Sequence, residues 1–279
     1  MSMSKPIIWQ EITWREVKKV AEEVGVALLP IGATEQHGFH CPTGVDFYNG
    51  YEIAKKISAR TGAIVAPPMP YGSHPYFHYG FSGTIPIRAV TQIEFVRDVV
   101  KGLVNNGFKK IIIVQAHGQW WTMHTAIQEI ALEVDAFMAV ATWWELACKT
   151  IKDVCETPFK HADEVETSVS LYLYPELCDM SKAEEDYTLK SYLDKKFTRP
   201  AVHSDLIEAF PIEAITFVPQ EANVMKTGAP GDPRLATAEK GKAIVEKAVD
   251  VISELIEYLK KNYKPDECPK VKPDLKVDM

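Results

Sequence analysis

The sequence alternates short apolar segments with amphipathic ones, and this alternation constrains its fold more than any other feature. Four segments have the aliphatic runs typical of strands buried on both faces: 26–32 (VALLPIG), 63–68 (AIVAPP), 109–118 (KKIIIVQAHG) and the start of 136–144 (AFMAVATWW). Helical periodicity fills the stretches between and after them: 12–25, 47–62, 91–107, 120–134 and 232–263. The pattern predicts an α/β fold with a mostly parallel sheet covered by helices on both faces.

Local signals refine these boundaries. Gly25 and Gly62 are expected to end the first two helices. Thr91, followed by Glu94, predicts an N-cap with a capping box for the third helix. We expect one domain over residues 1–263, with an irregular excursion or oligomer arm over 178–211 and an extended C-terminal tail over 264–279.

Composition excludes several classes of function. The chain has 279 residues, a formal net charge of −7 and no long Lys/Arg run, which disfavours nucleic acid and anionic membranes as partners. No apolar run reaches the roughly 18 residues of a membrane helix. The sequence contains no GxGxxG or P-loop motif, which argues against a nucleotide-dependent enzyme.

The cysteines and the first residues bear on the compartment. The five cysteines are scattered, and none forms a CxxC pair. The opening residues, MSMSKPIIWQEITWREVKK, contain no hydrophobic core of a signal peptide. We therefore expect a reduced, cytoplasmic protein.

Three polar segments follow predicted strands or begin a helix: 32–46, 115–120 and 161–168. Ligands of parallel α/β sheets bind beyond the carboxyl ends of the strands, so these segments are candidate site elements. Seven of the eight histidines lie between residues 37 and 161. Such clustering is unusual for a solvated surface, and it points to a shared site.

The first segment holds Glu35, His37, His40 and Asp46 within twelve residues. Glu35 and His37 are two apart, so an extended backbone directs both side chains to the same side. Imidazole and carboxylate groups are ligands of Zn²⁺ and Mn²⁺. Two interpretations stay open for this segment alone: a metal site, or a polar loop exposed to water.

The other two segments give similar alternatives. His117 ends an apolar strand, where it is either a hydrogen-bonded core histidine or a site residue. Asp163 and Glu164 are expected to complement a helix dipole. Glu166 precedes the apolar run TSVSLYLY, where a carboxylate requires a partner because a buried unpaired charge is costly. Together with His161, these residues describe a site rich in histidine and carboxylate.

Aromatic residues surround these segments. The tryptophans are candidates either for core packing or for a substrate pocket, and the segment PYGSHPYFHYGFSGT is polar enough to form a pocket wall or a subunit contact. The residues that we expect to contact substrate are Tyr71, His78, Gln119, Trp120 and Trp144.

These motifs together resemble those of the creatininase (creatinine amidohydrolase) family. The resemblance rests on Glu35-Gln36-His37, Asp46, His117-Gly118 and the run His161-Ala162 to Glu166-Thr167-Ser168, in the family's order and spacing over residues 26–175. It implies a three-layer α/β/α sandwich and a site for two divalent metal ions, Zn, Mn or Fe. It also implies a homo-oligomer, a hexamer in this family.

The resemblance further implies a role for each matching residue. Asp46 would bridge the two ions, Glu35 and His117 would hold one, and His37 the other. His161 would carry a proton, with Glu166 beside it. Creatininase itself has a Glu two residues after the strand-end His, where this chain has Gln119. The second ion therefore lacks one carboxylate, which Glu166 could supply; otherwise the site is looser or holds one ion.

The implied chemistry is attack of metal-activated water on a carbonyl, with His161 passing a proton to the leaving atom. The turns around Asp46 and His117 look most like the branch of 3-dehydro-scyllo-inosose hydrolases, which act on an oxidised inositol. A small cyclic substrate of that type is thus the first expectation. Hydrolysis of a C–N bond in a cyclic amide is the alternative. A family member that binds a small molecule without catalysis is the third.

Overall fold

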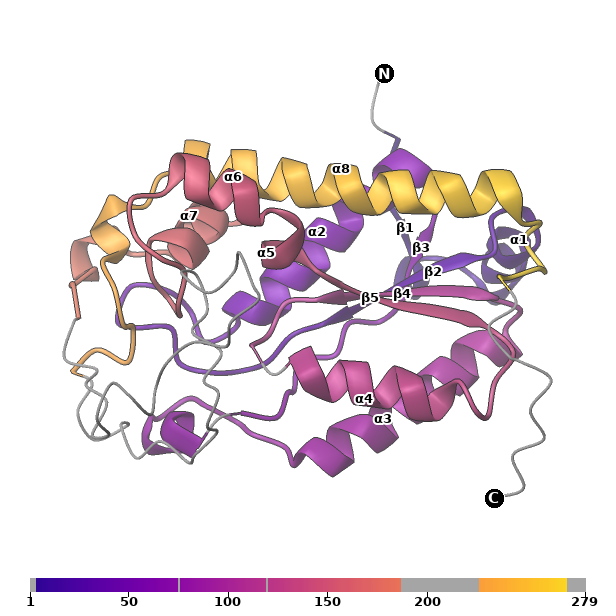
Figure 1. Ribbon diagram of the computed structural model, residues 1–279, viewed down its shortest axis with the longest axis horizontal. Coiled ribbons are helices and arrows are strands. Elements are labelled where there is room, and N and C mark those ends of the chain that lie inside the picture. Colours follow the sequence, from indigo (N-terminus) through magenta and orange to yellow (C-terminus); the bar gives the residue numbers. More distant parts are fainter. Residues whose placement is uncertain (1–3, 75, 119, 187–225, 270–279) are drawn as a thin grey trace.

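The computed structural model describes residues 4–74, 76–118, 120–186 and 226–269 (Figure 1). Within these residues, five parallel strands form one sheet in the order β1-β3-β2-β4-β5. The strands are β1 (Ile7–Ile8), β2 (Val26–Ile31), β3 (Ile64–Val65), β4 (Lys110–Gln115) and β5 (Phe137–Thr142). The predicted parallel sheet is confirmed, and each of the four predicted strand segments contains a strand.

Helices cover both faces of this sheet, so the α/β class with helices on both faces is confirmed (Figure 1). The α-helices are α1 (Trp14–Glu23), α2 (Val45–Thr61), α3 (Ala89–Asn105), α4 (Trp120–Ile130), α5 (Trp143–Leu146), α6 (Cys148–Val154), α7 (Glu164–Leu173) and α8 (Ala238–Asn262). Short 3₁₀ turns lie at η1 (Trp9–Glu11), η2 (Tyr76–Gly80), η3 (Pro175–Leu177), η4 (Met180–Lys182) and η6 (Pro233–Leu235).

Alternate side chains of the central strands pack into two separate hydrophobic cores, one on each face of the sheet. Val26 and Leu28 of β2 point to one face, where they pack with α2, α8 and the helices α5 to α7. Ala27 and Leu29 point to the other face, where they pack with α1, α3 and α4. Each fully buried aliphatic side chain contributes roughly 1.5–3 kcal/mol through the water it displaces. Burial on both faces explains why these strands are continuously apolar.

The order of the strands creates a crevice between β2 and β4. The chain passes from β2 through α2 to β3 on one side, and then returns through α3 to β4 on the other side of β2. Because such crossovers are right-handed, the two helices lie on opposite faces of the sheet. The connections therefore diverge at the carboxyl ends of β2 and β4, which is where parallel α/β folds bind ligands.

One predicted helix start is wrong. Helix α3 begins at Ala89 after the extended residue Arg88, and Thr91 lies inside its first turn, where it is not the N-cap. The Gln92 N–H donates to the Arg88 carbonyl at 3.0 Å, which closes a turn before the predicted start. The buried Gln92 side chain also accepts a hydrogen bond from the Ser73 N–H at 3.0 Å. The first turn of α3 is thus closed at Arg88, and a side chain of that turn is tied to the segment before it.

Two predicted segments lie partly beyond the described residues. Of the predicted excursion at 178–211, the structure describes 178–186, which include η4. Of the predicted tail at 264–279, it describes 264–269. The buried Lys110 Nζ donates to the carbonyls of Lys264, Pro265 and Glu267 at 2.7, 3.1 and 2.7 Å, which holds this turn against the start of β4.

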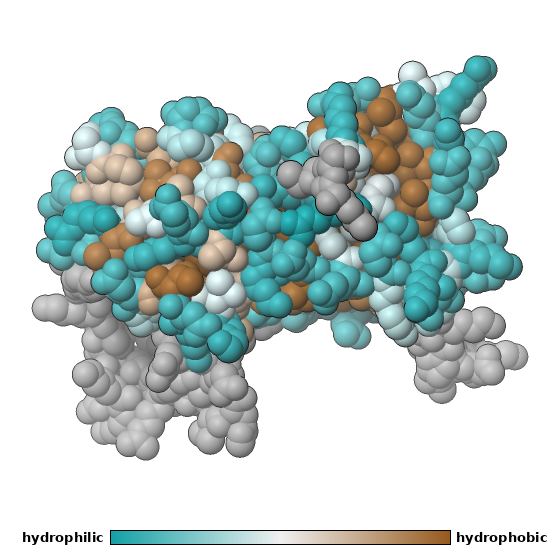
Figure 2. Space-filling view, turned by 90° about the horizontal axis from the view of Figure 1, so that it is seen from above, coloured by the Kyte–Doolittle hydropathy of each residue, from teal (hydrophilic) through white to brown (hydrophobic). Residues whose placement is uncertain are grey.

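The surface over α8 is mainly hydrophilic, with smaller hydrophobic patches between the polar side chains (Figure 2). In the part of the chain that the structure describes, no helix is both long and apolar enough to cross a membrane.

Candidate metal centre

The residues after β2 and the start of α2 bring the first segment together. A side chain at Gly32 would place its Cβ 2.5 Å from the Asp46 backbone, so only glycine permits this close approach. The Glu35 N–H donates to the Thr43 carbonyl at 2.9 Å, which closes the loop between them. As a result, Glu35 and His37 at the end of β2 face Asp46 in the first turn of α2. All three are buried.

His117 enters from the neighbouring strand. It lies two residues after the end of β4, and its carbonyl accepts a hydrogen bond from Gln115 Nε2 at 2.5 Å. Its ring contacts Asp46, with 2.9 Å between Nδ1 and Oδ2. The crevice between β2 and β4 therefore brings the first two predicted segments into contact.

The third segment closes the site from the start of α7. Asp163 is the N-cap and accepts hydrogen bonds from the N–H groups of Val165 and Glu166. Ala162 adopts a φ of 49°, which is unusual for a residue with a side chain, and its N–H donates to Glu166 Oε2 at 2.5 Å. This turn directs His161 and Glu166 toward the other segments.

Asp46 lies between two groups of candidate ligands. Its Oδ1 is 3.4 Å from His37 Nε2, which is also 3.5 Å from Glu166 Oε2. Its Oδ2 faces His117, whose Nδ1 is 3.7 Å from Glu35 Oε1. The ligand atoms of His37, Asp46 and Glu166 lie within 4.8 Å of one another, and those of Glu35, His74 and His117 do likewise. A third such group joins Glu35 and His37 to His161.

Three histidines share one mode of orientation. In each, the ring nitrogen that points away from the carboxylates (the outer nitrogen) lies within hydrogen-bond distance of a backbone carbonyl. The pairs are His37 Nδ1 and Glu35 O at 3.1 Å, His117 Nε2 and Ser73 O at 2.6 Å, and His161 Nε2 and Gln36 O at 2.8 Å. If the outer nitrogen carries the proton, the inner nitrogen presents its lone pair to the carboxylates. Metal-bound histidines are typically held in this way.

Burial and proximity shift the proton affinities of these groups. Burial alone lowers the pKa of His37, but the Asp46 carboxylate outweighs it and raises that pKa to about 10. Against the same effect of burial, Glu35 and Asp46 raise the pKa of His117 to about 9. Burial raises the pKa of Glu166 to about 8. Without another cation, protons on the two histidines thus balance the buried carboxylates.

This donor set fits divalent metal ions. Imidazole nitrogens and carboxylate oxygens are the ligands of Zn²⁺, Mn²⁺ and Fe²⁺. His37 Nε2 is buried and has no hydrogen-bond partner among the described residues, and the buried Glu35 Oε2 has His74 Nε2 at 3.0 Å but no hydrogen bond of good geometry. Since buried polar atoms are normally satisfied, these atoms are suited to face an ion.

The residues predicted to contact substrate are distributed unevenly. His78 is buried at the site, with Nδ1 3.8 Å from Glu35 Oε2. Tyr71 is 40% exposed and lies one residue before Gly72, which packs against the His117 ring. Trp144 lies in the core, with its ring 5.9 Å from that of Phe159, in keeping with the packing alternative for the tryptophans. Gln119 and the side chain of Trp120 lie outside the described residues.

Two further residues belong to the site, although the sequence patterns gave neither of them a role there. Gln36 Nε2 lies 3.1 Å from His161 Nε2 and donates to the Gly228 carbonyl at 2.6 Å, which joins a distant loop to the site. His74 Nε2 lies 3.0 Å from Glu35 Oε2. A signal for His74 was present, because it belongs to the Tyr/His-rich segment. No local pattern marks Gln36.

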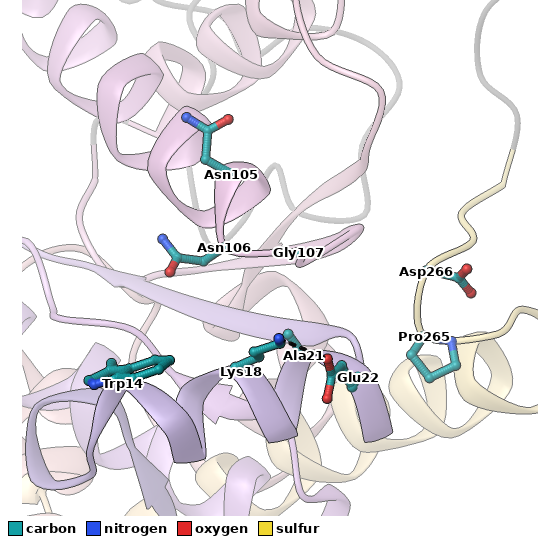
Figure 3. Close-up of a pocket in the computed structure, with 9 residues that line it drawn as sticks. All are labelled: Trp14, Lys18, Ala21, Glu22, Asn105, Asn106, Gly107, Pro265 and Asp266. Carbon is teal, nitrogen blue, oxygen red and sulfur yellow. Dashed lines mark ion pairs between the residues drawn. The ribbon is translucent and has the colours of Figure 1, made fainter.

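A separate pocket lies near the amino ends of the strands, away from the candidate metal centre (Figure 3). It is formed by α1, the turn before β4 and the turn at Pro265, and Lys18 pairs with Glu22 beside it at 3.8 Å. The residues that line it are Trp14, Lys18, Ala21, Glu22, Asn105, Asn106, Gly107, Pro265 and Asp266. This lining contains no histidine or cysteine, so the candidate metal ligands belong to the site at the carboxyl ends of β2 and β4 and not to this pocket.

Comparisons with known proteins match this architecture over most of the chain. A family model described as creatininase, creatinine amidohydrolase, matches residues 10–256. The 3-dehydro-scyllo-inosose hydrolase of Thermotoga maritima is 31% identical, over 96% of this chain and 88% of that protein. The creatinine amidohydrolase of Pseudomonas putida is 27% identical, over 91% of this chain and 97% of that protein.

A solved structure gives the same result. The manganese form of creatininase superposes with a TM-score of 0.72 and 25% identity, and the match covers 91% of this chain and 98% of that one. The shared fold thus extends to nearly the whole of a protein that has been solved with manganese.

Proposed function

Since the chain belongs to the creatininase family, a family of hydrolases, we propose that it is a divalent-metal-dependent hydrolase that opens a small cyclic substrate. One observation carries the proposal: the Asp46 carboxylate lies between two buried groups of histidine and carboxylate, with one oxygen toward each. Such an arrangement suits two ions that share a carboxylate.

The residues divide between two ions. Glu35 and His117 would hold one ion, His37 and Glu166 the other, and Asp46 would bridge them. Glu166 Oε2 is 3.5 Å from His37 Nε2 and would therefore supply this ion with a carboxylate, which the sequence of this chain, with Gln at position 119, does not offer there. When bound, the ions would activate water and polarise a substrate carbonyl.

His161 is suited to carry the proton. Its Nε2 faces the Gln36 carbonyl, and its Nδ1 lies 3.4 Å from Glu35 Oε1 and 3.8 Å from Glu166 Oε2. Burial, together with the nearby His37, lowers the pKa of His161 well below its usual value, so its ring is neutral at pH 7. A neutral ring with a free Nδ1 can accept a proton from water and release it to the leaving atom.

The relatives support one substrate class first. The 31% identical relative acts on 3-dehydro-scyllo-inosose, so we propose an oxidised inositol as substrate, with the bond beside a ring carbonyl as the one cleaved. A cyclic amide is the second candidate, because the 27% identical relative is a creatinine amidohydrolase. The half-exposed Tyr71 offers an aromatic surface for the apolar face of either ring.

Metal-free protein reconstituted with Mn²⁺ tests the proposal. We expect turnover of 3-dehydro-scyllo-inosose that EDTA abolishes and that added Mn²⁺ or Zn²⁺ restores. Turnover of creatinine alone would favour the cyclic amide. Tight binding of either compound without turnover, in the metal-loaded protein, would instead indicate a non-catalytic binding protein.

The remaining predictions extend beyond the site. We propose that residues 1–263 form one domain and that the protein is a cytoplasmic homohexamer. Light scattering of the purified protein tests the assembly, because the measured mass divided by the chain mass of 31.3 kDa gives the number of subunits.

A further inference from the structure

His74 is a buried histidine beside the candidate metal centre to which no role has been assigned above. Its side chain is fully buried, and Nε2 lies 3.0 Å from Glu35 Oε2. Neither ring nitrogen has a hydrogen-bond partner of good geometry among the described residues. Apart from this contact with Glu35, the described residues offer the ring nothing that replaces the water lost on burial, which is costly for polar atoms.

Neighbouring histidines of the same site do not share this condition. His40 Nε2 lies 2.8 Å from Thr167 Oγ1, and His78 Nδ1 lies 3.5 Å from Gln36 Nε2. The ring of His74 also lies beside that of His117, with 4.7 Å between ring centroids and 52° between ring planes. Its ligand atom lies within 4.8 Å of those of Glu35 and His117. His74 therefore faces the place where an ion held by those two residues would lie.

The backbone around His74 is built to keep it there. A Cβ at Gly72 would lie 2.8 Å from the His117 ring, so glycine allows the chain to pass close to that histidine. The Ser73 carbonyl accepts from His117 Nε2, and the Ser73 N–H donates to Gln92 Oε1. Pro75 follows in the sequence and restricts His74 to extended conformations.

From these contacts, we propose that His74 is a further protein ligand, through Nε2, of the ion held by Glu35 and His117. The inference rests on the proposed function, since it adds a residue to that metal centre. It gives this ion two imidazole ligands, whereas the ion at His37 and Glu166 has one. Nitrogen-rich sites favour Zn²⁺ over Mn²⁺, so the two positions would differ in metal preference.

Titration of metal-free full-length protein with Zn²⁺ tests this assignment. The variants are His74→Ala and His74→Gln, and His78→Gln is the matched control because His78 is also buried near Glu35 but belongs to none of the three ligand groups. The Gln side chain keeps an N–H donor for Glu35 and loses the imidazole ligand. Co²⁺ absorption in the visible range gives a second readout that follows ligand number and does not depend on activity.

For both His74 variants we expect one Zn²⁺ equivalent to bind as in the wild type, and the dissociation constant of the other to rise at least tenfold. The Co²⁺ spectrum should change in these variants and stay unchanged in His78→Gln. Wild-type affinity in both variants, or restored affinity in His74→Gln alone, would overturn the assignment; the second result would show that His74 only orients Glu35. A wild-type protein that binds no metal would overturn the proposed function itself.

Discussion

Asp46 and His117 come from different elements, and 2.9 Å separates Oδ2 of the first from Nδ1 of the second. The contact joins the first turn of α2 to the end of β4 across the crevice where the sheet connections diverge. Because the other carboxylate oxygen faces His37, the pair is also the junction between the two groups of candidate ligands.

Asp46→Asn should therefore remove both ions. An amide has one carbonyl oxygen and no negative charge, so it does not replace a bridging carboxylate. We expect elemental analysis to find less than a tenth of the wild-type metal content, while the exposed Asp98→Asn control retains all of it. Full occupancy in Asp46→Asn would show that Asp46 is not shared.

His161→Gln should separate catalysis from metal binding. If His161 Nδ1 carries the proton, the variant loses about 10²–10⁴-fold in kcat and keeps its metal. The exposed His124→Gln serves as a control for histidine replacement in general. Because His161 also belongs to a ligand group with Glu35 and His37, loss of metal in His161→Gln would reassign it as a ligand.

Glu166→Gln should affect stability and metal binding in opposite directions. The folded-state pKa of Glu166 is raised to about 8, above its unfolded value near 4.5, so the folded protein binds more protons between these pH values. The stability of the metal-free protein therefore falls as pH rises from 4.5 to 8, and above pH 8 the whole contribution of protonated Glu166 has been lost. At pH 8.5 in EDTA, we expect the variant to be more stable than the wild type by a few kcal/mol, at about 1.4 kcal/mol per pKa unit.

The comparison requires thermal or urea unfolding at pH 4 and at pH 8.5. The advantage of the variant should vanish at pH 4, where both states of the wild-type group are protonated. With Mn²⁺ present the order should reverse, since the variant has lost a ligand. A variant less stable than the wild type in EDTA at pH 8.5 would contradict the burial argument.

Metal binding should release protons. His37 and His117 have pKa values of about 10 and 9 in the metal-free protein, so both are protonated at pH 7.5 and must lose that proton to act as ligands. The apparent affinity of each ion should then rise about tenfold per pH unit for each proton released. Calorimetry in buffers of different ionisation enthalpy should detect at least one proton per ion. Release of none would contradict the assignment of these histidines.

Gly32→Ala should damage the site through the backbone. Its Cβ would lie 2.5 Å from the Asp46 backbone, which forces the end of β2 away from α2. We expect a loss of several kcal/mol in unfolding free energy, or of metal binding if the protein still folds, because the overlap involves backbone atoms that cannot rotate away. Gly102→Ala is the control, since it meets nothing within 4 Å on α3 and should stabilise that helix by about 1 kcal/mol.

Much of the fold follows from local patterns in the sequence. The aliphatic runs of β2 and β4 predict buried parallel strands, and the amphipathic segments between them predict the covering helices. The start of α3 does not follow, because Gln92 is drawn to Ser73 by a contact between distant segments. Thr91 and Glu94 match the pattern of an N-cap with a capping box, yet the helix begins two residues before Thr91.

The candidate site can be predicted from the sequence to a similar extent. Glu35, His37 and Asp46 lie within twelve residues, and His117 ends a strand, so their convergence follows from the parallel topology. Gln36 and His74 do not follow, because each acts through contacts between distant segments: Gln36 with Gly228 and His161, and His74 with Glu35. Such contacts cannot be inferred from the spacing of residues along the chain.

The most direct test of the account is the number of ions bound per chain. Metal-free wild-type protein should be loaded with Mn²⁺, freed of excess metal by gel filtration and measured by elemental analysis. Two equivalents per chain are predicted, because Asp46 presents one oxygen to each ligand group. One equivalent or none would contradict the shared carboxylate on which the account depends.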